Sequence, residues 1–173
     1  TTLLLHFFGP VSRAHYNMNK NYPMMRLKMA PYGGLFLSKK VIEEVGYPNE
    51  EYFLYVDDTD WTFRMNNCGY NLYFCSESII KDIDLTWTTE KGVYYYYDPT
   101  VREYQIYYTM RNRVFFSKNF IKIKYIYLFN MVIFLVFTYV INLFVVPKIA
   151  TKRFKLILKA VKDGQNGKLG KTF

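Results

Sequence analysis

The chain has 173 residues, enough for one domain with a substantial core, and its formal net charge is +9. The charge is uneven, because residues 1–103 have a balance of −3, whereas residues 104–162 carry eleven basic side chains and no acidic one. The basic residues bracket an apolar run, and no known nucleic-acid motif is present, so we expect no nucleic-acid partner. The chain begins at Thr1 and shows no signal peptide, and we interpret it as a fragment or a processed product.

The first 83 residues predict short strands that alternate with short helices. Strands are expected at residues 2–8, 35–37, 52–56, 70–74 and 78–83, with a loop at 13–28. One helix is expected to run from the N-cap Ser38, whose hydroxyl can accept a bond from a free backbone N–H, to Val45, with Gly46 as a left-handed stop. A second helix is expected from Trp61 to residue 68, where Gly69 ends it.

Two cysteines, Cys68 and Cys75, lie in this part and lack the spacing of metal ligands. We expect free thiols in a reducing compartment, and a disulfide between them is the alternative.

The second part predicts long helices after an aromatic loop at residues 84–99. Asp98-Pro99-Thr100 is expected to open the first of them, because proline suits the first turn and Thr100 with Glu103 resembles a capping box.

Residues 125–147 form an apolar run without Lys, Arg, Asp or Glu, roughly the length that spans a bilayer core. A transmembrane helix, an interfacial helix or hairpin, and a buried core helix are the three interpretations. Basic side chains flank the run on both sides and favour membrane contact without fixing an orientation: Lys118, Lys122, Lys124, Lys148, Lys152, Arg153 and Lys155.

One segment joins an apolar run to a cluster of carboxylates. Residues 52–61 read Tyr-Phe-Leu-Tyr-Val-Asp-Asp-Thr-Asp-Trp, so a predicted strand ends in Asp57, Asp58 and Asp60 at the mouth of a helix. Carboxylates crowded in such a place are poised for metal binding or for proton abstraction. From these residues alone, a solvated cluster that caps the helix explains the pattern at least as well.

Further segments fall in a fixed order between residues 30 and 170. They are residues 33–38 (Gly-Gly-Leu-Phe-Leu-Ser), the 44–48 turn, residues 53–60, Arg64, Gly69-Tyr70, residues 107–113 (Tyr-Tyr-Thr-Met-Arg-Asn-Arg) and residues 163–170. This ordered set resembles glycosyltransferase family 2, especially its bacterial rhamnosyl- and galactofuranosyl-transferase-like members. Residues 107–113 are similar to that group's "YY..RN" helix, and residues 163–170 are similar to its closing "DG..G..G" segment.

The resemblance implies an α/β fold, namely the C-terminal part of a GT-A-type mixed sheet with flanking helices, followed by a hydrophobic membrane-associated helical region. It implies inverting transfer of a sugar from a nucleotide-sugar donor to a hydroxyl of a saccharide or lipid-linked saccharide acceptor, in the synthesis of a cell-surface polysaccharide. Asp58 is the expected general base, because a hydroxyl attacks the anomeric carbon best when a nearby carboxylate accepts its proton. Asp57 is expected to position the acceptor or the loop.

Other residues are expected to bind the donor sugar or the acceptor. Gly33 and Gly34 would let the backbone approach the donor sugar closely. Asp60 would hold the acceptor or shape the loop. Trp61 or Trp87 would offer a sugar-stacking face, or would pack in the core.

Arg111, Asn112 and Arg113 have two interpretations. They form a solvated basic helix face, or they contact the diphosphate of a lipid-linked acceptor at the membrane surface, because Arg binds phosphate through two parallel bonds.

A divalent cation, Mg²⁺ or Mn²⁺, is implied for the full-length enzyme, with its main ligands in the half that would precede this chain. Asp58-Thr59-Asp60 is spelled D-x-D, but its position matches the later base motif. Many relatives place a His ligand where this sequence has Lys81, so Asp82 substitutes as a ligand, or Lys81 neutralises the leaving diphosphate, or the alignment slips. His6 and His15 lie too far upstream and are interpreted as ordinary loop or core histidines.

Two parts are therefore expected: residues 1–99 as the C-terminal half of a GT-A catalytic domain on the cytoplasmic side, and residues 100–173 as a membrane-associated helical region with the hydrophobic segment 125–147. Because the donor-binding half is absent from the sequence, we expect this fragment alone to be inactive. The alternatives are a non-catalytic membrane-anchored binding protein and an inactive remnant.

Overall fold

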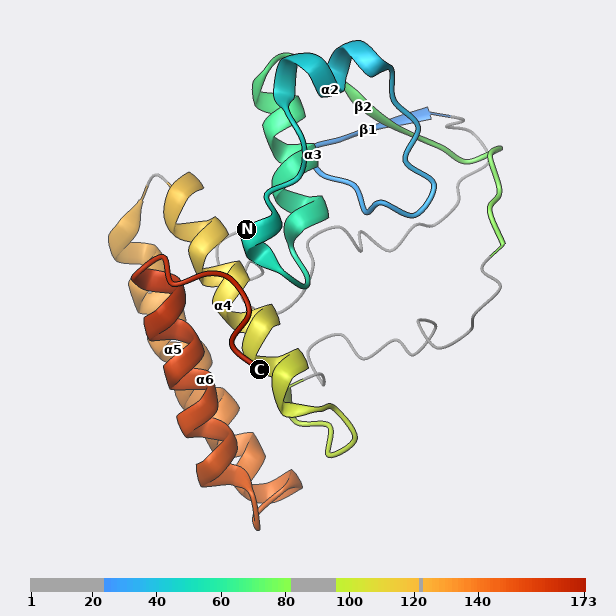
Figure 1. The fold of residues 1–173 in the computed structure, drawn as a ribbon. Coiled ribbons are helices and arrows are strands. Elements are labelled where there is room, and N and C mark those ends of the chain that lie inside the picture. The colour runs from blue at the N-terminus through green and yellow to red at the C-terminus, as the bar shows by residue number, and fades with distance from the viewer. Residues whose placement is uncertain (1–23, 82–95, 122) are drawn as a thin grey trace. The chain divides into compact units, whose positions relative to one another are not determined.

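The computed structural model describes residues 24–81, 96–121 and 123–173 (Figure 1). In this part the chain is rich in helices and has one small two-stranded sheet. It divides into two compact units, which are described separately: residues 24–50 with 56–81, and residues 51–55 with 96–173. The predictions for residues 2–8 and for most of residues 84–99, with His6, His15, Asp82 and Trp87, lie outside the described residues.

The first unit packs two helices and a strand pair around a small core. Strand β1 (Met24–Leu27) pairs antiparallel with β2 (Leu72–Cys75), so that Met24 lies opposite Cys75 and Leu27 lies opposite Leu72. The core consists of Val41 from α2 (Lys39–Val45), Trp61 and Met65 from α3 (Asp57–Asn67), and Leu72. Cys68 and Cys75 are exposed free thiols, as expected.

The predicted strands are only partly present. A strand does form near residues 70–74, but its partner β1 lies in a stretch for which we predicted a loop. Residues 35–37 form no strand, so that prediction is wrong, and the described part of the predicted 78–83 strand, residues 78–81, forms none either. The small sheet is compatible with an α/β class, whereas the described residues contain nothing as large as the mixed sheet that the resemblance implies.

The helix ends were predicted more accurately than the strands. Helix α2 runs from the N-cap Ser38 to Val45 and stops at Gly46, which has a φ of 79°. The Ser38 hydroxyl, however, makes no capping hydrogen bond. Helix α3 begins at Asp57, four residues earlier than predicted, because the chain turns sharply after Tyr52 and never forms the expected 52–56 strand.

The second unit is built on three helices: α4 (Glu103–Phe120), α5 (Lys124–Val145) and α6 (Ala150–Gln165), drawn in yellow, orange and red in Figure 1. The predicted long helix is thus confirmed, although it starts at Glu103. Its first turn is closed by Gln105, whose side-chain oxygen accepts the Arg102 N–H at 3.0 Å, and not by the predicted pair of Thr100 and Glu103. The unit's core includes Ile106, Val114, Phe134 and Ile157.

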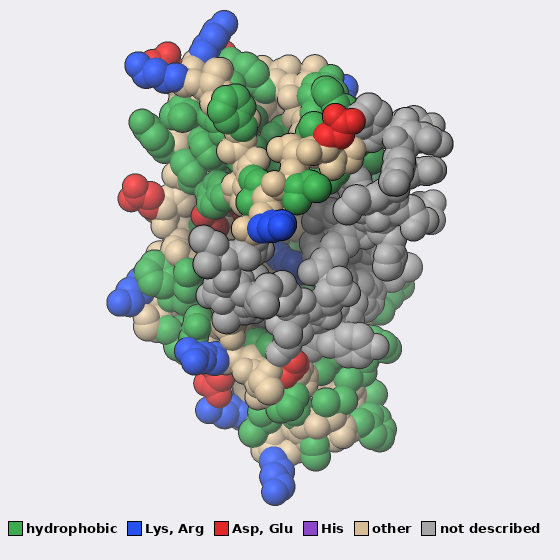
Figure 2. Space-filling model, turned by 90° about the vertical axis from the view of Figure 1, so that its right-hand side faces the viewer, with side chains coloured by type: hydrophobic (Ala, Val, Ile, Leu, Met, Phe, Trp, Pro, Cys, Tyr) green, Lys and Arg blue, Asp and Glu red, His purple; other side chains and the backbone are tan. Residues whose placement is uncertain are grey.

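Helix α5 differs from a helix on a water-soluble core, because its exposed face is apolar and its buried side contains polar residues. Its buried residues include three polar ones, Asn130, Thr138 and Asn142. Its exposed face is apolar and consists largely of Tyr125, Phe129, Val132, Val136, Phe137, Val140 and Phe144. Among the described residues it is the one helix long and apolar enough to cross a membrane, and only 28% of its most apolar stretch is buried. In the lower part of Figure 2, hydrophobic side chains gather at the right-hand edge.

Arg153, one of the basic residues that flank the apolar run 125–147, does not face the surroundings as expected. Arg153 is buried and donates a hydrogen bond to the Asp98 carbonyl at 3.0 Å, so it joins α6 to the segment before α4. Burial lowers the pKa of its guanidinium.

Helices α4 and α6 approach each other closely at Gly164. A Cβ atom at this position would overlap the Arg111 carbonyl oxygen and would lie 2.9 Å from the Val114 Cβ. Since both obstacles belong to α4, whose backbone cannot move aside alone, only glycine allows this spacing.

Replacement of Gly164 by alanine is expected to destabilise the helical unit by about 1–3 kcal/mol, because overpacking outweighs the gain in helix propensity. The unfolding midpoint in detergent measures the effect. The matched control is Lys155→Ala on the exposed side of α6, which should shift stability by no more than about 0.5 kcal/mol. Equal midpoints for the two variants would contradict the close contact.

Candidate functional site

The acidic cluster forms the first turn of α3. Asp57, Asp58 and Asp60 all lie there, where the positive end of the helix dipole favours negative charge. The turn starts from Val56, a β-branched residue with a φ of 71°, and the Asp60 N–H donates to its carbonyl at 2.8 Å. A left-handed backbone at such a residue is strained by about 1–3 kcal/mol, and strain of this kind concentrates at functional sites.

Asp58 combines partial burial with a neighbouring negative charge. Burial raises the pKa of its carboxyl, Asp57 raises it further, and hydrogen bonds from Thr59 act in the opposite direction. Those bonds come from the Thr59 N–H at 2.6 Å and the Thr59 hydroxyl at 3.2 Å, both to the Asp58 Oδ1. A carboxylate with a raised pKa is a stronger base than an ordinary one, which suits proton abstraction.

Tyr32 is a member of this cluster that the sequence analysis did not assign. Its hydroxyl is hydrogen-bonded to Asp57, and burial together with the charges of Asp57 and Asp58 raises the pKa of that hydroxyl. Its ring meets the Trp61 ring edge-on, with centroids 5.9 Å apart. The place of Tyr32 directly before the two glycines was the signal that could have drawn attention to it.

The glycine turn is tied to the acidic turn through a buried hydroxyl. Thr62 Oγ1 accepts the Ala30 N–H at 3.0 Å and lies 2.8 Å from the Asp58 carbonyl oxygen, which can accept its proton. A side chain at Gly33 would meet nothing within 4 Å, whereas one at Gly34, where φ is 79°, would meet Ile80 at 2.8 Å. The first unit therefore brings the predicted residues Gly33, Gly34, Asp57 and Asp58 into one region, with open space at Gly33.

Asp60 and Trp61 have structural partners. Asp60 is buried and pairs with Arg64 at 3.0 Å, and Arg64 in turn donates to the carbonyls of Val45 and Tyr47, both at 2.9 Å. Trp61 is buried and donates its indole N–H to the Gly46 carbonyl at 2.7 Å. These contacts favour the loop-shaping interpretation of Asp60 and the core-packing interpretation of Trp61.

Arg111 and Asn112 lie in the other unit, on α4, and both are fully buried, with 0% of their surface exposed. The Asn112 amide donates to three carbonyl oxygens, those of Tyr52, Leu54 and Tyr55, at 2.6–2.9 Å. The Arg111 guanidinium donates to the Tyr52 carbonyl at 3.0 Å and to the Gly170 carbonyl at 2.6 Å.

The two expected interpretations of these residues, a solvated face and a phosphate contact, both required exposed side chains. Their donors bond instead within the protein: most go to backbone carbonyls, and the Arg111 Nε–H donates to the Asn112 side-chain oxygen at 2.9 Å. We therefore assign Arg111 and Asn112 a structural role. The physical reason is that residues 52–55 turn without a strand partner, and their carbonyls need donors from elsewhere.

The same helix binds the C-terminal tail, which Figure 1 shows running back along α4. The Tyr107 hydroxyl donates to Asp163 at 2.8 Å. The Tyr108 hydroxyl accepts the N–H groups of Thr172 and Phe173 at 2.7 and 3.1 Å. Residues 107–112 and 163–170, which we singled out for their resemblance to two family segments, thus contact each other.

The described residues were compared with the side-chain groups that hold metal ions. No group of three or more His, Cys, Asp or Glu side chains in residues 24–81, 96–121 and 123–173 could hold an ion. In the acidic turn, Asp57 is hydrogen-bonded to Tyr32, and the Asp58 Oδ1 accepts both bonds from Thr59.

In comparisons with known proteins, no protein-family model, no curated protein and no solved structure matches this chain.

We call the hydrogen bonds from Arg111 and Asn112 to the carbonyls of Tyr52, Leu54, Tyr55 and Gly170 the carbonyl clamp. The variant Asn112→Asp tests it. The aspartate keeps the shape of the side chain but has no donor, so it faces three carbonyl oxygens without a hydrogen bond, at a cost of about 1–3 kcal/mol or more. We expect a lower unfolding midpoint and faster proteolysis within residues 50–56. The matched control is Asn166→Asp, an exposed position at the end of α6, which should leave both readouts nearly unchanged. Similar behaviour of the two variants would show that the clamp contributes little.

Proposed function

We propose that this chain is part of a membrane-associated inverting glycosyltransferase, in which Asp58 is the general base. The observation that carries the proposal is the environment of Asp58: a partly buried carboxylate of raised pKa, beside a second carboxylate and an open glycine turn. The ordered resemblance of residues 30–170 to glycosyltransferase family 2 supports the same function. The GT-A architecture, with a donor-binding half outside this chain, is part of the proposal.

The proposed step moves one proton and one glycosyl group. Asp58 accepts the proton of the acceptor hydroxyl while that oxygen forms a bond to the anomeric carbon of the donor sugar. The bond from the anomeric carbon to the diphosphate oxygen breaks, and the nucleoside diphosphate leaves with the electron pair. Attack opposite the leaving group inverts the anomeric centre. Asp57, held by Tyr32, orients the acceptor or the turn and keeps the pKa of Asp58 high.

The variant Asp58→Asn should abolish transfer while the fold is kept or slightly stabilised. Folding raises the pKa of the Asp58 carboxyl, so the folded state favours its protonated form. Its contribution to stability is therefore lost as the pH rises through the raised pKa. Asparagine stays neutral at every pH, so the variant does not lose this stability. Transfer is measured as incorporation of label from UDP-galactofuranose or dTDP-rhamnose by membranes that carry the protein expressed from the full reading frame. Stability is measured as the unfolding midpoint.

The pH dependence gives a second readout of the same site. Because Asp58 must be ionised to act as base, the acidic limb of kcat/KM should lie above the ordinary range of an aspartate. Glu77→Gln, a neutralised carboxylate at an exposed position of the same unit, is the control and should retain transfer. Normal turnover by Asp58→Asn would exclude Asp58 as the base.

Membrane association is the second element of the proposal. Helix α5 buries its polar residues Asn130, Thr138 and Asn142 beside apolar ones, and its exposed face is apolar, which is the arrangement expected when the surroundings are hydrocarbon and not water. We propose that the exposed face of α5 contacts lipid.

Two lysines on that face should weaken membrane attachment. Val132→Lys with Val136→Lys places both charges on one side of α5, one turn apart, at about 2.5–3.5 kcal/mol each near the middle of a bilayer. The measured quantity is the fraction retained in the membrane pellet after an alkaline wash. Leu158→Lys, at an exposed apolar position of α6, is the control and should be retained like the native chain. Full retention of the double variant would contradict lipid contact.

A further inference from the structure

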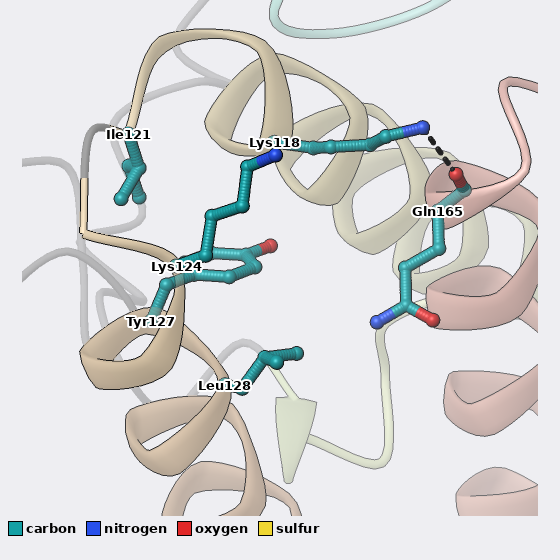
Figure 3. A pocket seen from close by; sticks show the side chains of 6 residues that line it. All are labelled: Lys118, Ile121, Lys124, Tyr127, Leu128 and Gln165. Carbon is teal, nitrogen blue, oxygen red and sulfur yellow. Dashed lines mark hydrogen bonds between the residues drawn. The ribbon is translucent and has the colours of Figure 1, made fainter.

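A small hollow lies in the helical unit where the end of α4, the start of α5 and the end of α6 meet. Its volume is about 240 Å³, and it is lined by Lys118, Ile121, Lys124, Tyr127, Leu128 and Gln165 (Figure 3). All six residues belong to one unit, so the geometry of the hollow does not depend on the other.

Two lysine side chains help to line the hollow, whose walls are almost entirely apolar. In Figure 3 the Lys118 side chain crosses toward α6, where its amine donates to the Gln165 carbonyl at 2.7 Å, and the Lys124 side chain rises toward it from the first turn of α5. An ammonium has three donors, so this bond leaves two on Lys118 for a ligand. The lining residues include no carboxylate that would neutralise the pair.

The apolar side of the hollow continues onto the exposed face of α5. Leu128 belongs to both surfaces, being 47% exposed, and Phe129 and Val132 follow it along the helix. A ligand that fits the hollow would thus have an anionic group at the two amines and hydrocarbon along α5.

We propose that the hollow bounded by Lys118, Lys124, Tyr127 and Leu128 is a binding site for one anionic glycerophospholipid, whose phosphate meets the two lysines and whose acyl chain lies on the exposed face of α5. The site rests on the membrane association proposed above, and it does not depend on the transferase reaction. Lysines at the end of a lipid-contacting helix reach the headgroup level, where anionic lipid attracts them.

Native mass spectrometry of the full chain tests this site. The chain is solubilised in detergent together with an equimolar mixture of phosphatidylglycerol and phosphatidylcholine. The lipids that stay bound to the protein are then identified and counted from the mass. We expect one phosphatidylglycerol to be retained in preference to phosphatidylcholine. Lys118→Gln with Lys124→Gln should lower that preference by about fivefold or more, since each lysine near an anionic headgroup contributes measurably to binding. Lys118→Arg with Lys124→Arg should preserve it, because the charges remain.

The control removes the same charge elsewhere: Lys148→Gln with Lys155→Gln, both at exposed positions toward the other end of α5 and on α6. This pair should retain phosphatidylglycerol like the native chain. Equal loss in both double variants, or equal retention of the two lipids by the native chain, would overturn the site while leaving membrane association intact. Loss of every lipid from the native chain would overturn both the site and the proposed membrane association.

Discussion

The helical unit depends on a buried pair of donors, Arg111 and Asn112, at the centre of α4. Between them they bind the carbonyl groups of Tyr52, Leu54, Tyr55 and Gly170. Burial of a guanidinium is expensive unless its donors are used and its charge is stabilised. Here the carbonyl oxygens supply the acceptors, and the Tyr108 ring lies 4.8 Å from the guanidinium carbon, close enough for a cation–π contact.

This clamp joins segments that are far apart in the sequence. Residues 52–55 turn through two left-handed positions, Phe53 and Tyr55, and the carbonyl bonds from α4 hold that turn. The chain then passes directly into the acidic turn of α3. On its other side, Arg111 holds the tail at Gly170, and Gly164 lets α6 approach the same stretch of α4. The residues that look like separate family motifs in the sequence thus serve one packing arrangement.

The sequence predicted the parts of this structure that local patterns govern. The stop of α2 at Gly46, the length of α5 and the presence of a long helix that carries Tyr107 and Tyr108 follow from turn residues and from apolar periodicity. The 52–56 strand was predicted wrongly because an apolar run of five residues does not reveal whether a partner strand exists. Here the donors come from Asn112, 57 to 60 positions away. The burial of Arg111 was missed for the same reason, since a basic residue in a basic segment gives no local sign that it faces the core.

Hydrogen exchange in the tail is the measurement that tests the clamp most directly. The Gly170 N–H donates to the Glu51 carbonyl and the Thr172 N–H to the Tyr108 hydroxyl, so peptides covering residues 167–173 should exchange slowly. In Arg111→Lys the charge is kept but the forked donors are lost, and exchange in these peptides should accelerate by about tenfold or more. Fast exchange in the native chain, or an unchanged rate in the variant, would contradict a fold that depends on Arg111 and Asn112.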